Sequence, residues 1–398
     1  MKKLLSLIVS AVMVCSLSAQ TTTSSMNGKV TDEKGEALVG ATVIAVHTPS
    51  GTQYGAITNA DGRYNLQGMR TGGPYSLTVS YVGYQSVELT GITLSLGEPR
   101  TFDVQLKETQ ELDAVVVVST ANSRFNANKT GAASNFTRGV IENLPSIDRS
   151  ISDIARLSPL ASSTKSSTGG ISFAGTNNRY NSFQIDGAVS NDVFGLTASG
   201  TNGGQTGTNP ISMETIEEVQ VVIAPYDVRQ SGFTGGGINA VTKSGNNAFR
   251  GSAYTYYKDN NLVGKGAKGE KYAEQTTQTY GVTLGGPIVK DKLFFFVSGE
   301  YYKDETPATV YDSNNIEGFA TQEQLTQIRE QYKALTGYDA ADFGQHTPET
   351  WSANVLARLD WNINNNNKMM LRYNYGGASL DRYSTSNSSY TFNDASFD

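Results

Sequence analysis

Five segments in the second half of the chain alternate apolar with polar residues over about ten positions each. They are residues 249–258, 276–286, 293–303, 352–362 and 368–377. Alternation gives a strand one apolar and one polar face, and about ten tilted residues cross the hydrocarbon core of a bilayer. A soluble β-sandwich alternates in the same way, so the strands alone do not separate a membrane barrel from a secreted β-protein.

The connections between these segments separate the two classes better. In chain order they are residues 259–275 (long), 287–292 (short), 304–351 (long) and 363–367 (short). Short turns at one end and long loops at the other are typical of outer-membrane barrels. We therefore expect residues 249–398 to contain the first strands of a transmembrane antiparallel β-barrel. A helix is expected at residues 321–335 in the second long loop, either as an external cap or as a plain surface helix.

The five strands and their connections use about 26 residues per strand over residues 249–377. A large outer-membrane barrel of about 22 strands, built at that rate, needs roughly 570 residues to close. We therefore expect the chain to hold only the beginning of a barrel. An open sheet edge leaves backbone groups without partners in lipid, so residues 20–398 alone are not expected to form a closed pore.

The start of the chain predicts a removed signal peptide. Lys2 and Lys3 precede a short apolar run, residues 4–14, and small residues follow up to Ala19. This order indicates a signal peptide at residues 1–19 with cleavage after Ala19, and the run is too short for a membrane-spanning helix. Acylation of Cys15 is the alternative.

Cleavage would remove the single cysteine, so the mature chain would have neither a disulfide nor a thiolate ligand. It would also remove two of 31 basic residues and none of 37 acidic ones, which leaves a net charge of −8. A mildly acidic chain argues against a nucleic-acid partner. Beyond residue 19 there is no long apolar stretch, which excludes an ordinary helical membrane protein.

Residues 24–107 predict a small β-sandwich of about seven short strands separated by turns. Residues 77–81 and 102–107 alternate strictly, and residues 32–35, 59–62 and 70–74 have turn compositions. Four motifs resemble the carboxypeptidase regulatory-like domain: Gly28–Asp32, Val39–Val43, Thr58–Tyr64 and Tyr81–Tyr84. A regulatory-like domain by itself would also fit a protease-associated accessory module.

Residues 111–120 run from an acidic start into four consecutive valines. Because β-branched residues favour an extended backbone, such a segment is able to add as a strand to the open sheet edge of a partner. The alternative is an ordinary strand of the neighbouring domains. The residues of interest are Asp113, Ala114, Val115, Val116, Val117 and Val118.

Residues 121–248 mix short helical and strand patterns with many Gly, Asn, Ser and Thr residues. The patterns predict a helix at residues 147–157, a strand at 183–185 entering an Asp186–Gly187 turn, and a short helix at 210–218 entering a strand at 219–223. The glycines at 235–237 predict a close-packed turn before one more strand.

These elements resemble, in order and spacing, the plug domain of TonB-dependent outer-membrane receptors. The matching residues are Asp186, Gly187, Gly235, Gly236, Gly237, Asn239, Thr242 and Lys243. The connection Ala224–Phe233 departs from the common plug, and with the N-terminal sandwich it resembles Oar-like receptors more than SusC-like glycan importers. The resemblance therefore does not imply a glycan substrate for this chain.

The resemblance implies an outer-membrane receptor that imports, or exports, an unidentified substrate. Its partners would be outer-membrane lipid and TonB with its inner-membrane motor, and its N-terminal domain would face the periplasm. The valine segment, residues 113–118, looks like the TonB box through which such receptors contact TonB. We further expect the loop from Asp186 to Asn209 to touch ligand, with a periplasmic loop of no ligand role as the alternative.

No catalytic, metal-binding or cofactor-binding constellation is evident in the sequence. His47 and His346 lack grouped partners, and the glycines near residue 200 do not open a helix after a strand. Glu217 and Glu218 are interpreted as a solvated face. We therefore expect no enzymatic activity and no cofactor. A secreted or surface-anchored adhesin is the alternative, and heat-modifiable migration on a gel after membrane extraction would distinguish it from a receptor.

Overall fold

The structure, a computed structural model, describes most of the chain between residues 22 and 397. Left undescribed within that range are residues 109–115, 120–131, 147–148, 164–169, 193, 195–196, 198–199, 202–203, 224, 226–229, 231, 267–268, 270–273, 308–320, 340–346, 365–366 and 382–395. The proposed signal peptide therefore lies outside the described residues. Strands dominate, which confirms the mainly β fold class. No helix in the described part is both long and apolar enough to cross a membrane.

The chain divides into two compact units. The first comprises Met1–Gly251, Leu284–Val297 and Leu356–Tyr373, and the second comprises Ser252–Thr283, Ser298–Val355 and Asn374–Asp398. The first unit holds the N-terminal sandwich, the small central sheet and one stretch of the strands that follow.

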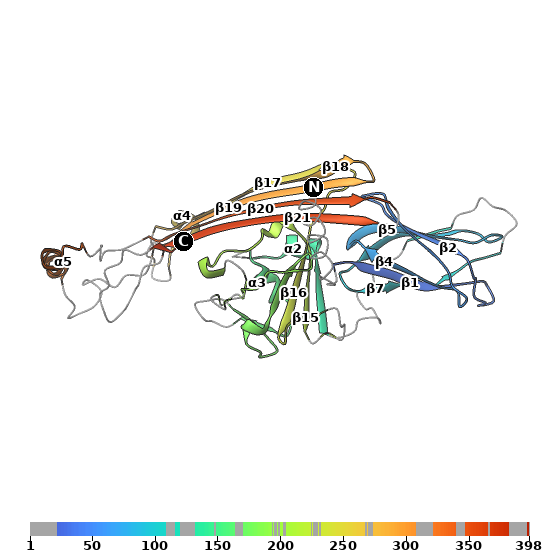
Figure 1. Cartoon of the computed structure of the whole chain (residues 1–398), viewed down its shortest axis with the longest axis horizontal. Helices are drawn as coiled ribbons and strands as arrows, with labels where there is room; N and C mark the ends of the chain where they lie inside the picture. The colour runs from blue at the N-terminus through green and yellow to red at the C-terminus, as the bar shows by residue number, and fades with distance from the viewer. Residues whose placement is uncertain are drawn as a thin grey trace, which may run out of the picture. The chain divides into compact units, whose positions relative to one another are not determined.

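The N-terminal strands form two sheets that face each other across one core. One sheet has the order β4-β1-β7, with β8 also paired to β1, and the other has the order β3-β2-β5-β6-β9. The strands are β1 (Ser24–Thr31), β2 (Thr42–His47), β3 (Thr52–Ile57), β4 (Arg63–Met69), β5 (Gly72–Ser80), β6 (Val87–Leu94), β7 (Pro99–Thr101), β8 (Val104–Gln105) and β9 (Val116–Ser119). In Figure 1 these strands are blue to cyan.

Alternation explains which side chains fill this core. Tyr75, Leu77 and Val79 are every second residue of β5, and all three are fully buried. The Tyr75 hydroxyl reaches a partner there, because it donates a hydrogen bond to the Arg70 carbonyl at 2.8 Å. The expected turn at residues 70–74 is shorter than predicted: β5 already begins at Gly72, so only Arg70 and Thr71 connect it to β4.

The central region, residues 132–242, is a five-stranded sheet with short helices, and we refer to it by its predicted name, the plug. Its order is β10-β15-β16-β13-β14, and β13 runs parallel to β16. The elements are β10 (Ala132–Thr137), α2 (Arg138–Asn143), α3 (Ile151–Ala155), β11 (Ala161–Ser163), β12 (Ile171–Phe173), η2 (Asn178–Tyr180), β13 (Ser182–Ile185), β14 (Ala188–Val189), η3 (Gly204–Thr206), η4 (Met213–Thr215), β15 (Ile216–Ile223) and β16 (Gly236–Thr242). Strands β11 and β12 form a separate antiparallel pair.

Two helix predictions in the plug are wrong in extent. The helix expected from residue 147 begins only at Ile151, because Ser150 caps it in a capping box with Asp153. Arg149 just before the cap has a positive φ of 46°, which cannot continue a helix. The helix expected at residues 210–218 is a single 3-10 turn, since extended pairing in β15 already starts at Ile216.

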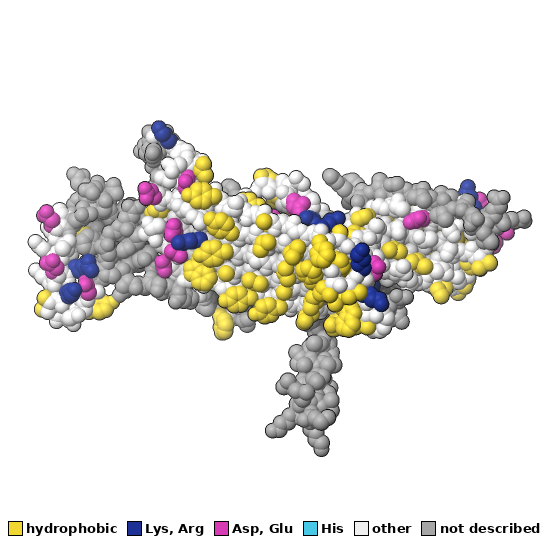
Figure 2. All heavy atoms as spheres, turned by 90° about the horizontal axis from the view of Figure 1, so that it is seen from above, with side chains coloured by type: hydrophobic (Ala, Val, Ile, Leu, Met, Phe, Trp, Pro, Cys, Tyr) yellow, Lys and Arg dark blue, Asp and Glu magenta, His cyan; other side chains and the backbone are white. Residues whose placement is uncertain are grey.

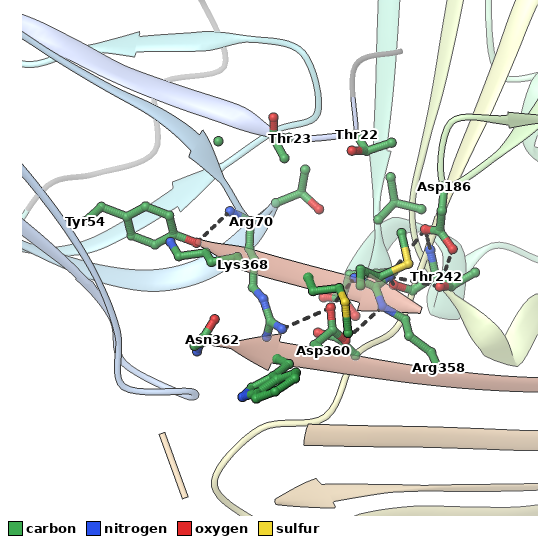
Figure 3. Close-up of a pocket in the computed structure, with 18 residues that line it drawn as sticks. Thr22, Thr23, Tyr54, Arg70, Asp186, Thr242, Arg358, Asp360, Asn362 and Lys368 are labelled. Atoms are coloured by element: carbon green, nitrogen blue, oxygen red, sulfur yellow. Dashed lines mark hydrogen bonds and ion pairs between the residues drawn. The ribbon is translucent and has the colours of Figure 1, made fainter. Parts of the chain in front are cut away.

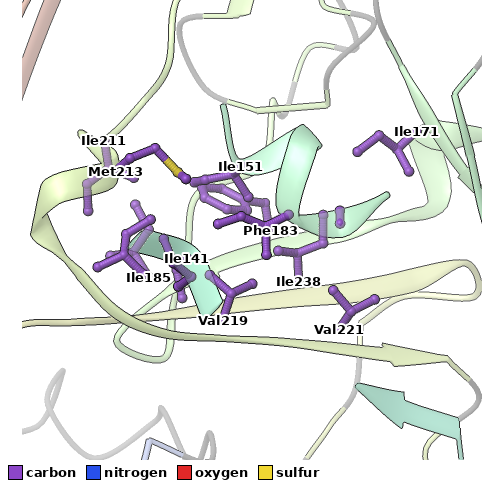
Figure 4. Packing of buried hydrophobic residues seen from close by; sticks show 14 of the residues in the cluster. Ile141, Ile151, Ile171, Phe183, Ile185, Ile211, Met213, Val219, Val221 and Ile238 are labelled. Atoms are coloured by element: carbon purple, nitrogen blue, oxygen red, sulfur yellow. The ribbon is translucent and has the colours of Figure 1, made fainter. Parts of the chain in front are cut away.

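The plug core contains buried aliphatic side chains from its sheet and helices (Figure 4). Two further members come from later in the chain: Phe296 of β19 (Leu293–Glu305) and Leu356 of β20 (Glu349–Asn362). Glycine is required at one point in this core. A Cβ at Gly236 would collide with the ring of Phe173, which is itself fully buried. The plug core is therefore tightly packed and is completed by side chains from these two later strands.

The wall strands form one sheet in strict chain order, β17-β18-β19-β20-β21-β22. The strands are β17 (Arg250–Asp259), β18 (Thr276–Val289), β19 (Leu293–Glu305), β20 (Glu349–Asn362), β21 (Lys368–Asp381) and β22 (Ser396–Phe397). The five expected strands are confirmed, each reaching somewhat further than predicted at one end or both. Figure 1 shows them, yellow to red, as a curved sheet.

The two faces of this sheet differ as alternation requires. Val355, Leu359 and Trp361 of β20 are exposed large hydrophobic residues, whereas Leu356 and Asp360 are buried. Figure 2 shows hydrophobic side chains, many of them aromatic, gathered on the exposed face. An exposed apolar face opposite a buried polar one is what a lipid-facing wall needs.

Two helices lie in the long connections, α4 (Asn260–Val263) and α5 (Gln322–Thr336). Helix α5 confirms the prediction for this loop. Thr321 caps its start together with Gln324, and Gly337 ends it with a φ of 72°. The predicted apolar face is only partly covered: Leu325 is buried, while Leu335 is 86% exposed.

Candidate functional site

The hairpin formed by β13 and β14 carries a carboxylate into the interior. Ile185 pairs with Ala188, so Asp186 and Gly187 form a two-residue turn. Both turn residues have positive φ angles, 46° and 78°, a geometry that favours Asp followed by Gly. The strand and turn predicted here are thus observed. The Asp186 side chain is only 2% exposed, so this charge needs partners inside the protein.

Four groups surround the Asp186 carboxylate. The Thr242 backbone N–H donates to Oδ1 at 2.8 Å, and the Thr242 hydroxyl donates to Oδ2 at 2.7 Å. Arg358 Nη1 lies 3.3 Å from Oδ1, and Arg372 Nη1 lies 3.2 Å from Oδ2. The plug therefore supplies neutral donors from the end of β16, and the wall strands β20 and β21 supply the opposite charge.

Arg358 connects this carboxylate to a second one. Its Nε and Nη2 each donate to Asp360 at 2.9 Å, a bidentate arrangement, and its Nη1 donates to the Thr242 carbonyl at 2.9 Å. Asp360 also pairs with Arg70 Nη2 at 3.2 Å. Figure 3 shows how these side chains converge. We call Arg70, Asp186, Arg358, Asp360 and Arg372 the arginine–aspartate cluster.

The cluster joins three parts of the first unit. Arg70 comes from the connection between β4 and β5 of the sandwich, Asp186 from the plug, and the other three residues from the wall strands. All five side chains are at most 16% exposed. Buried ion pairs of this kind add little net stability, but removing one partner strands a buried charge and costs about 3–5 kcal/mol. The cluster is therefore suited to hold one defined arrangement.

A cavity of about 170 Å³ lies beside the cluster. Tyr54 and Lys368 line it together with cluster residues (Figure 3). Trp361 is a further lining residue. The Lys368 ammonium lies 3.1 Å from the centroid of the Tyr54 ring, a cation–π contact between wall and sandwich. Glu217 also lines the cavity, and burial raises the pKa of its carboxyl. The space would hold a few water molecules, at about 30 Å³ each.

The remaining plug-motif residues are spread along β16. A Cβ at Gly237 would lie 2.8 Å from Phe233, and one at Gly235 would collide with Asn181, so both glycines permit close approach. Asn239 pairs in register with Gln184 and with Gln220. The structure thus brings Asp186 and Thr242 together, while the glycines and Asn239 shape the strand.

Lys243 lies outside the arginine–aspartate cluster. Its ammonium is 3.7 Å from Glu214 and 3.9 Å from Glu142, and its side chain is 11% exposed. Burial lowers the pKa of Lys243. This residue ties the end of β16 to α2 and η4.

The interpretation of Glu217 and Glu218 as a solvated face is wrong. Glu218 is 2% exposed, and both its carboxyl oxygens accept the Leu96 N–H, at 3.0 and 3.1 Å. Gln220 donates to the Leu96 carbonyl at 2.6 Å, so plug side chains bind both backbone polar groups of one sandwich residue. Burial raises the pKa of Glu218 to about 8, although the Leu96 N–H opposes that shift.

The valine segment is only partly described. Val116, Val117 and Val118 lie in β9, which pairs in parallel with β6 of the sandwich. Asp113, Ala114 and Val115 lie outside the described residues. Half of the predicted TonB-contact segment is therefore an edge strand of the sandwich sheet.

Of the two histidines, only His47 lies within the described residues. His47 is buried and its Nδ1 lies 2.6 Å from the Ser50 hydroxyl. Burial, with the nearby charge of Arg70, lowers the pKa of His47 to about 3, so its ring is neutral. His346 lies outside the described residues. Among the residues that the structure describes, no group of three His, Cys, Asp or Glu side chains could hold a metal ion.

A second cavity, about 230 Å³, lies within the plug. Residues from the expected ligand-contact loop line it, including Thr201 and Asn209, together with Ser182 of β13. Arg156 is the one charged residue among the described residues that line this cavity. The lining is otherwise hydroxyl, amide, glycine and apolar.

Comparison with known proteins identifies the relatives of this chain. Residues 25–107 match the carboxypeptidase regulatory-like domain, and residues 241–316 match an outer membrane beta barrel domain. Over 349 residues the chain is 27% identical to the TonB-dependent transporter Oar of Myxococcus xanthus, covering 77% of this chain and 31% of Oar. The chain is a relative of the TonB-dependent outer-membrane receptors. The chain is accordingly a protein of the outer membrane. It spans about a third of the length of the curated relative that it matches.

Solved structures of receptors resemble the chain more distantly. The siderophore receptor PirA of Acinetobacter baumannii has a TM-score of 0.43 and 22% identity, covering 63% of this chain and 32% of PirA. The outer membrane transporter YddB of Escherichia coli has a TM-score of 0.45 and 16% identity, covering 64% of this chain and 34% of YddB.

Four of the five cluster residues were missed by the sequence analysis: Arg70, Arg358, Asp360 and Arg372. A usable signal existed for two of them. Arg358 and Asp360 stand two apart on the polar face of a predicted wall strand, so both must point to the same side. Charges on the inner face of a barrel strand are met by water or by another element, so this pair marks a position to examine for a partner.

Proposed function

We propose that the chain is the energy-coupled part of an outer-membrane transporter that moves a solute with force delivered by TonB. In this proposal residues 1–19 are the signal peptide, 24–107 the sandwich, 111–120 the coupling segment, 121–248 the plug and 249–398 the first wall strands. The matched curated relative is a TonB-dependent transporter. We propose no catalytic role for any residue.

This proposal rests on one observation, which is that the plug packs against the wall strands and forms ion pairs with them. Asp186 on the plug hairpin meets Arg358 and Arg372 of β20 and β21, and Leu356 of β20 enters the plug core. A domain that shares its hydrophobic core and its buried ion pairs with a barrel wall does not move unless those contacts are broken. Solute passage would require these contacts to be rearranged by work from outside the membrane.

The source of that work must be the periplasm, since an outer membrane holds no usable ion gradient or nucleotide. In our proposal residues 113–118 are the segment that TonB binds. They are free of proline and stand between the sandwich and the plug in the chain. A TonB contact by strand addition would use backbone hydrogen bonds, and these do not depend on the identity of one side chain.

The test is capture of the full-length, detergent-extracted receptor on immobilised periplasmic domain of TonB. Val116→Pro removes a donor and disfavours the strand ladder, so capture should fall by about tenfold or more. Val116→Ala keeps the backbone and is the matched control, with less than about a threefold change. Equal capture of both variants and of a protein lacking residues 113–118 would contradict this function for the segment.

A second element of the proposal concerns ligand. We infer that the loop Asp186–Asn209 contributes to ligand contact through the 230 Å³ cavity that it lines. The lining favours an uncharged polar group with, at most, one anionic group near Arg156. Protection of Thr201→Cys from an added thiol reagent, both with and without ligand, would count against ligand access there.

A further inference from the structure

The sandwich contacts a turn of the wall sheet through its own turn between β2 and β3. We call residues 290–292, which connect β18 to β19, the wall turn. The Asn247 N–H donates to the Pro49 carbonyl at 2.9 Å, and the Asn247 side-chain amide donates to the Asp291 carboxylate at 2.7 Å. A Cβ at Gly51 would collide with the Asp291 side chain. The sandwich turn and the wall turn therefore lie in direct contact.

Three sandwich side chains extend this contact along the ends of the wall strands. The Thr52 hydroxyl accepts a hydrogen bond from the Asn362 amide at 3.0 Å, and the Arg70 guanidinium lies 5.6 Å from the centroid of the Phe294 ring. The ion pair of Arg70 and the cation–π contact of Tyr54 add to these contacts (Figure 3). The sandwich therefore contacts β19, β20 and β21, each near the end that adjoins a short turn.

On the plug side the sandwich is bound at Leu96, two residues beyond the end of β6. Leu96 is fully buried, yet neither of the two hydrophobic cores described above includes it. Its N–H binds Glu218, and its carbonyl accepts hydrogen bonds from Gln220 and, at 3.2 Å, from Asn135. One sandwich residue is thus bonded to both β10 and β15 of the plug sheet.

The plug, the wall strands and the sandwich are joined by a closed set of three contacts. Plug and wall meet at Asp186, sandwich and wall meet at the wall turn, and sandwich and plug meet at Leu96. Because the sandwich has a core of its own, a shift of the plug relative to the wall must break one of the two sandwich contacts. Both are made largely by polar groups, and polar contacts between domains permit relative motion.

We propose that the sandwich is a clamp that holds the plug against the wall, and that it leaves the wall turn before the plug is displaced. The displacement is a movement of the folded plug relative to the wall, so the plug strands keep their own pairing. The clamp goes beyond the proposed function of residues 113–118, because it does not depend on which segment TonB binds.

An engineered disulfide between the two turns tests the clamp in the full-length receptor. A Cβ at Gly51 would lie 3.0 Å from Asp291 Cγ. Since a C–C bond measures about 1.5 Å, the two Cβ atoms would be at most about 4.5 Å apart, within the roughly 3.5–4.5 Å found in disulfides. The lone cysteine, Cys15, lies in the proposed signal peptide, so the pair Gly51→Cys/Asp291→Cys would be unique in the mature chain.

The matched control is Gly35→Cys/Asp291→Cys. Gly35 also lies in a sandwich turn with a positive φ, 85° against 63° at Gly51, so the backbone strain of the substitution is similar. A Cβ at Gly35 would have no neighbour within 4 Å, so this pair should stay reduced when diamide cross-links the first one. Failure of the first pair to cross-link would overturn the proposal, because the two turns would then not be in contact.

The measurement is ion current through the receptor in a planar bilayer, because a plugged barrel passes ions only when its plug is displaced. A fixed, low concentration of urea makes the openings frequent enough to count. The cross-linked receptor should open about tenfold less often than the same protein after reduction, since the sandwich can no longer leave the wall turn. Equal opening rates in the two states would also overturn the proposal, because the plug would then move while the sandwich stays docked.

Gly51→Ala tests the same contact in the opposite direction. Its methyl group would collide with Asp291, so the sandwich should leave the wall turn and openings should become about tenfold more frequent. Gly35→Ala, with similar backbone strain and no collision, should open at the wild-type rate. In an Asp291→Gly background the effect of Gly51→Ala should disappear, because the side chain that it meets is gone. Equal effects of the two alanine variants would contradict the clamp, since strain inside the sandwich would then explain them.

Discussion

The sandwich and the plug each have a buried core, but they complete it differently. Every member of the sandwich cluster lies between Met26 and Leu106, in strands of the sandwich itself. The plug cluster takes Phe296 and Leu356 from the wall strands, and the plug charge Asp186 is neutralised by wall arginines. The sandwich therefore completes its core with its own residues, whereas the plug needs residues of the wall strands to complete its core.

The largest difference in response between the two regions is expected at Asp186. Asn keeps the positive-φ turn but removes the charge that Arg358 and Arg372 share, so Asp186→Asn should lower the stability of the plug by roughly 3 kcal/mol. Hydrogen exchange of the full-length receptor in micelles should report faster exchange in β13 and β16 and no change in the sandwich. Asp339→Asn is the matched control: Asp339 also pairs with two cations but is exposed, and its loss should leave stability unchanged within error. Equal effects of the two variants would contradict a special role for the cluster.

The opposite region gives the second prediction. Leu77 is fully buried in the sandwich, so Leu77→Ala should cost about 2–5 kcal/mol through lost burial and a residual cavity. If the sandwich is self-contained, denaturant unfolding followed by exchange should show β2 and β5 losing protection while β15 and β16 keep theirs. Parallel loss in the plug would show that the two cores form one cooperative unit.

A third prediction concerns the closest packing in the plug. Gly236→Ala places a methyl group against the ring of Phe173 and should cost about 1–3 kcal/mol by overpacking. The cost should shrink in a Phe173→Leu background, because the ring that causes the collision is gone. A double-mutant cycle on these two positions measures this coupling, and strict additivity would place the strain elsewhere.

Glu218, at the contact between plug and sandwich, is expected to make the stability of the fold depend on pH. The pKa of Glu218 is raised to about 8 by burial, above its unfolded value near 4.5. A carboxyl with a raised pKa binds its proton more tightly in the folded state, so this group disfavours folding progressively as pH rises from about 4.5 to about 8, by roughly 1 kcal/mol per pH unit. Glu218→Gln should remove that part of the slope. An unchanged slope in the variant would mean that Glu218 is ionised without penalty.

The sequence predicts the parts of this molecule that depend on local pattern. Alternation and connection length identify the five wall strands, the Asp186–Gly187 turn follows from its dipeptide, and α5 follows from its caps and periodicity. Patterns of this kind are written within about ten to fifteen neighbouring residues.

The parts that were missed depend on partners far along the chain. Asp186 and Arg358 are separated by 172 residues, and Glu218 and Leu96 by 122. Glu218 looks solvated in its own segment because nothing local shows that a sandwich peptide will cover it. The helix expected from residue 147 was too long because apolar spacing outweighed the cap at Ser150. Periodicity identifies the apolar and polar faces of a strand or helix, but it does not identify which distant residues pack against those faces.

In the proposed function, force reaches the plug through residues 113–118, which lie between the sandwich and the plug in the chain. The most direct measurement uses a solute that cells lacking the receptor no longer accumulate or release, found by comparing the culture medium of the two strains. A receptor lacking residues 113–118 should reach the outer membrane in normal amounts and bind that solute at the cell surface, yet move it no better than the strain without receptor. Movement at the wild-type rate by the deletion variant would contradict the account, because force would then reach the plug by another route.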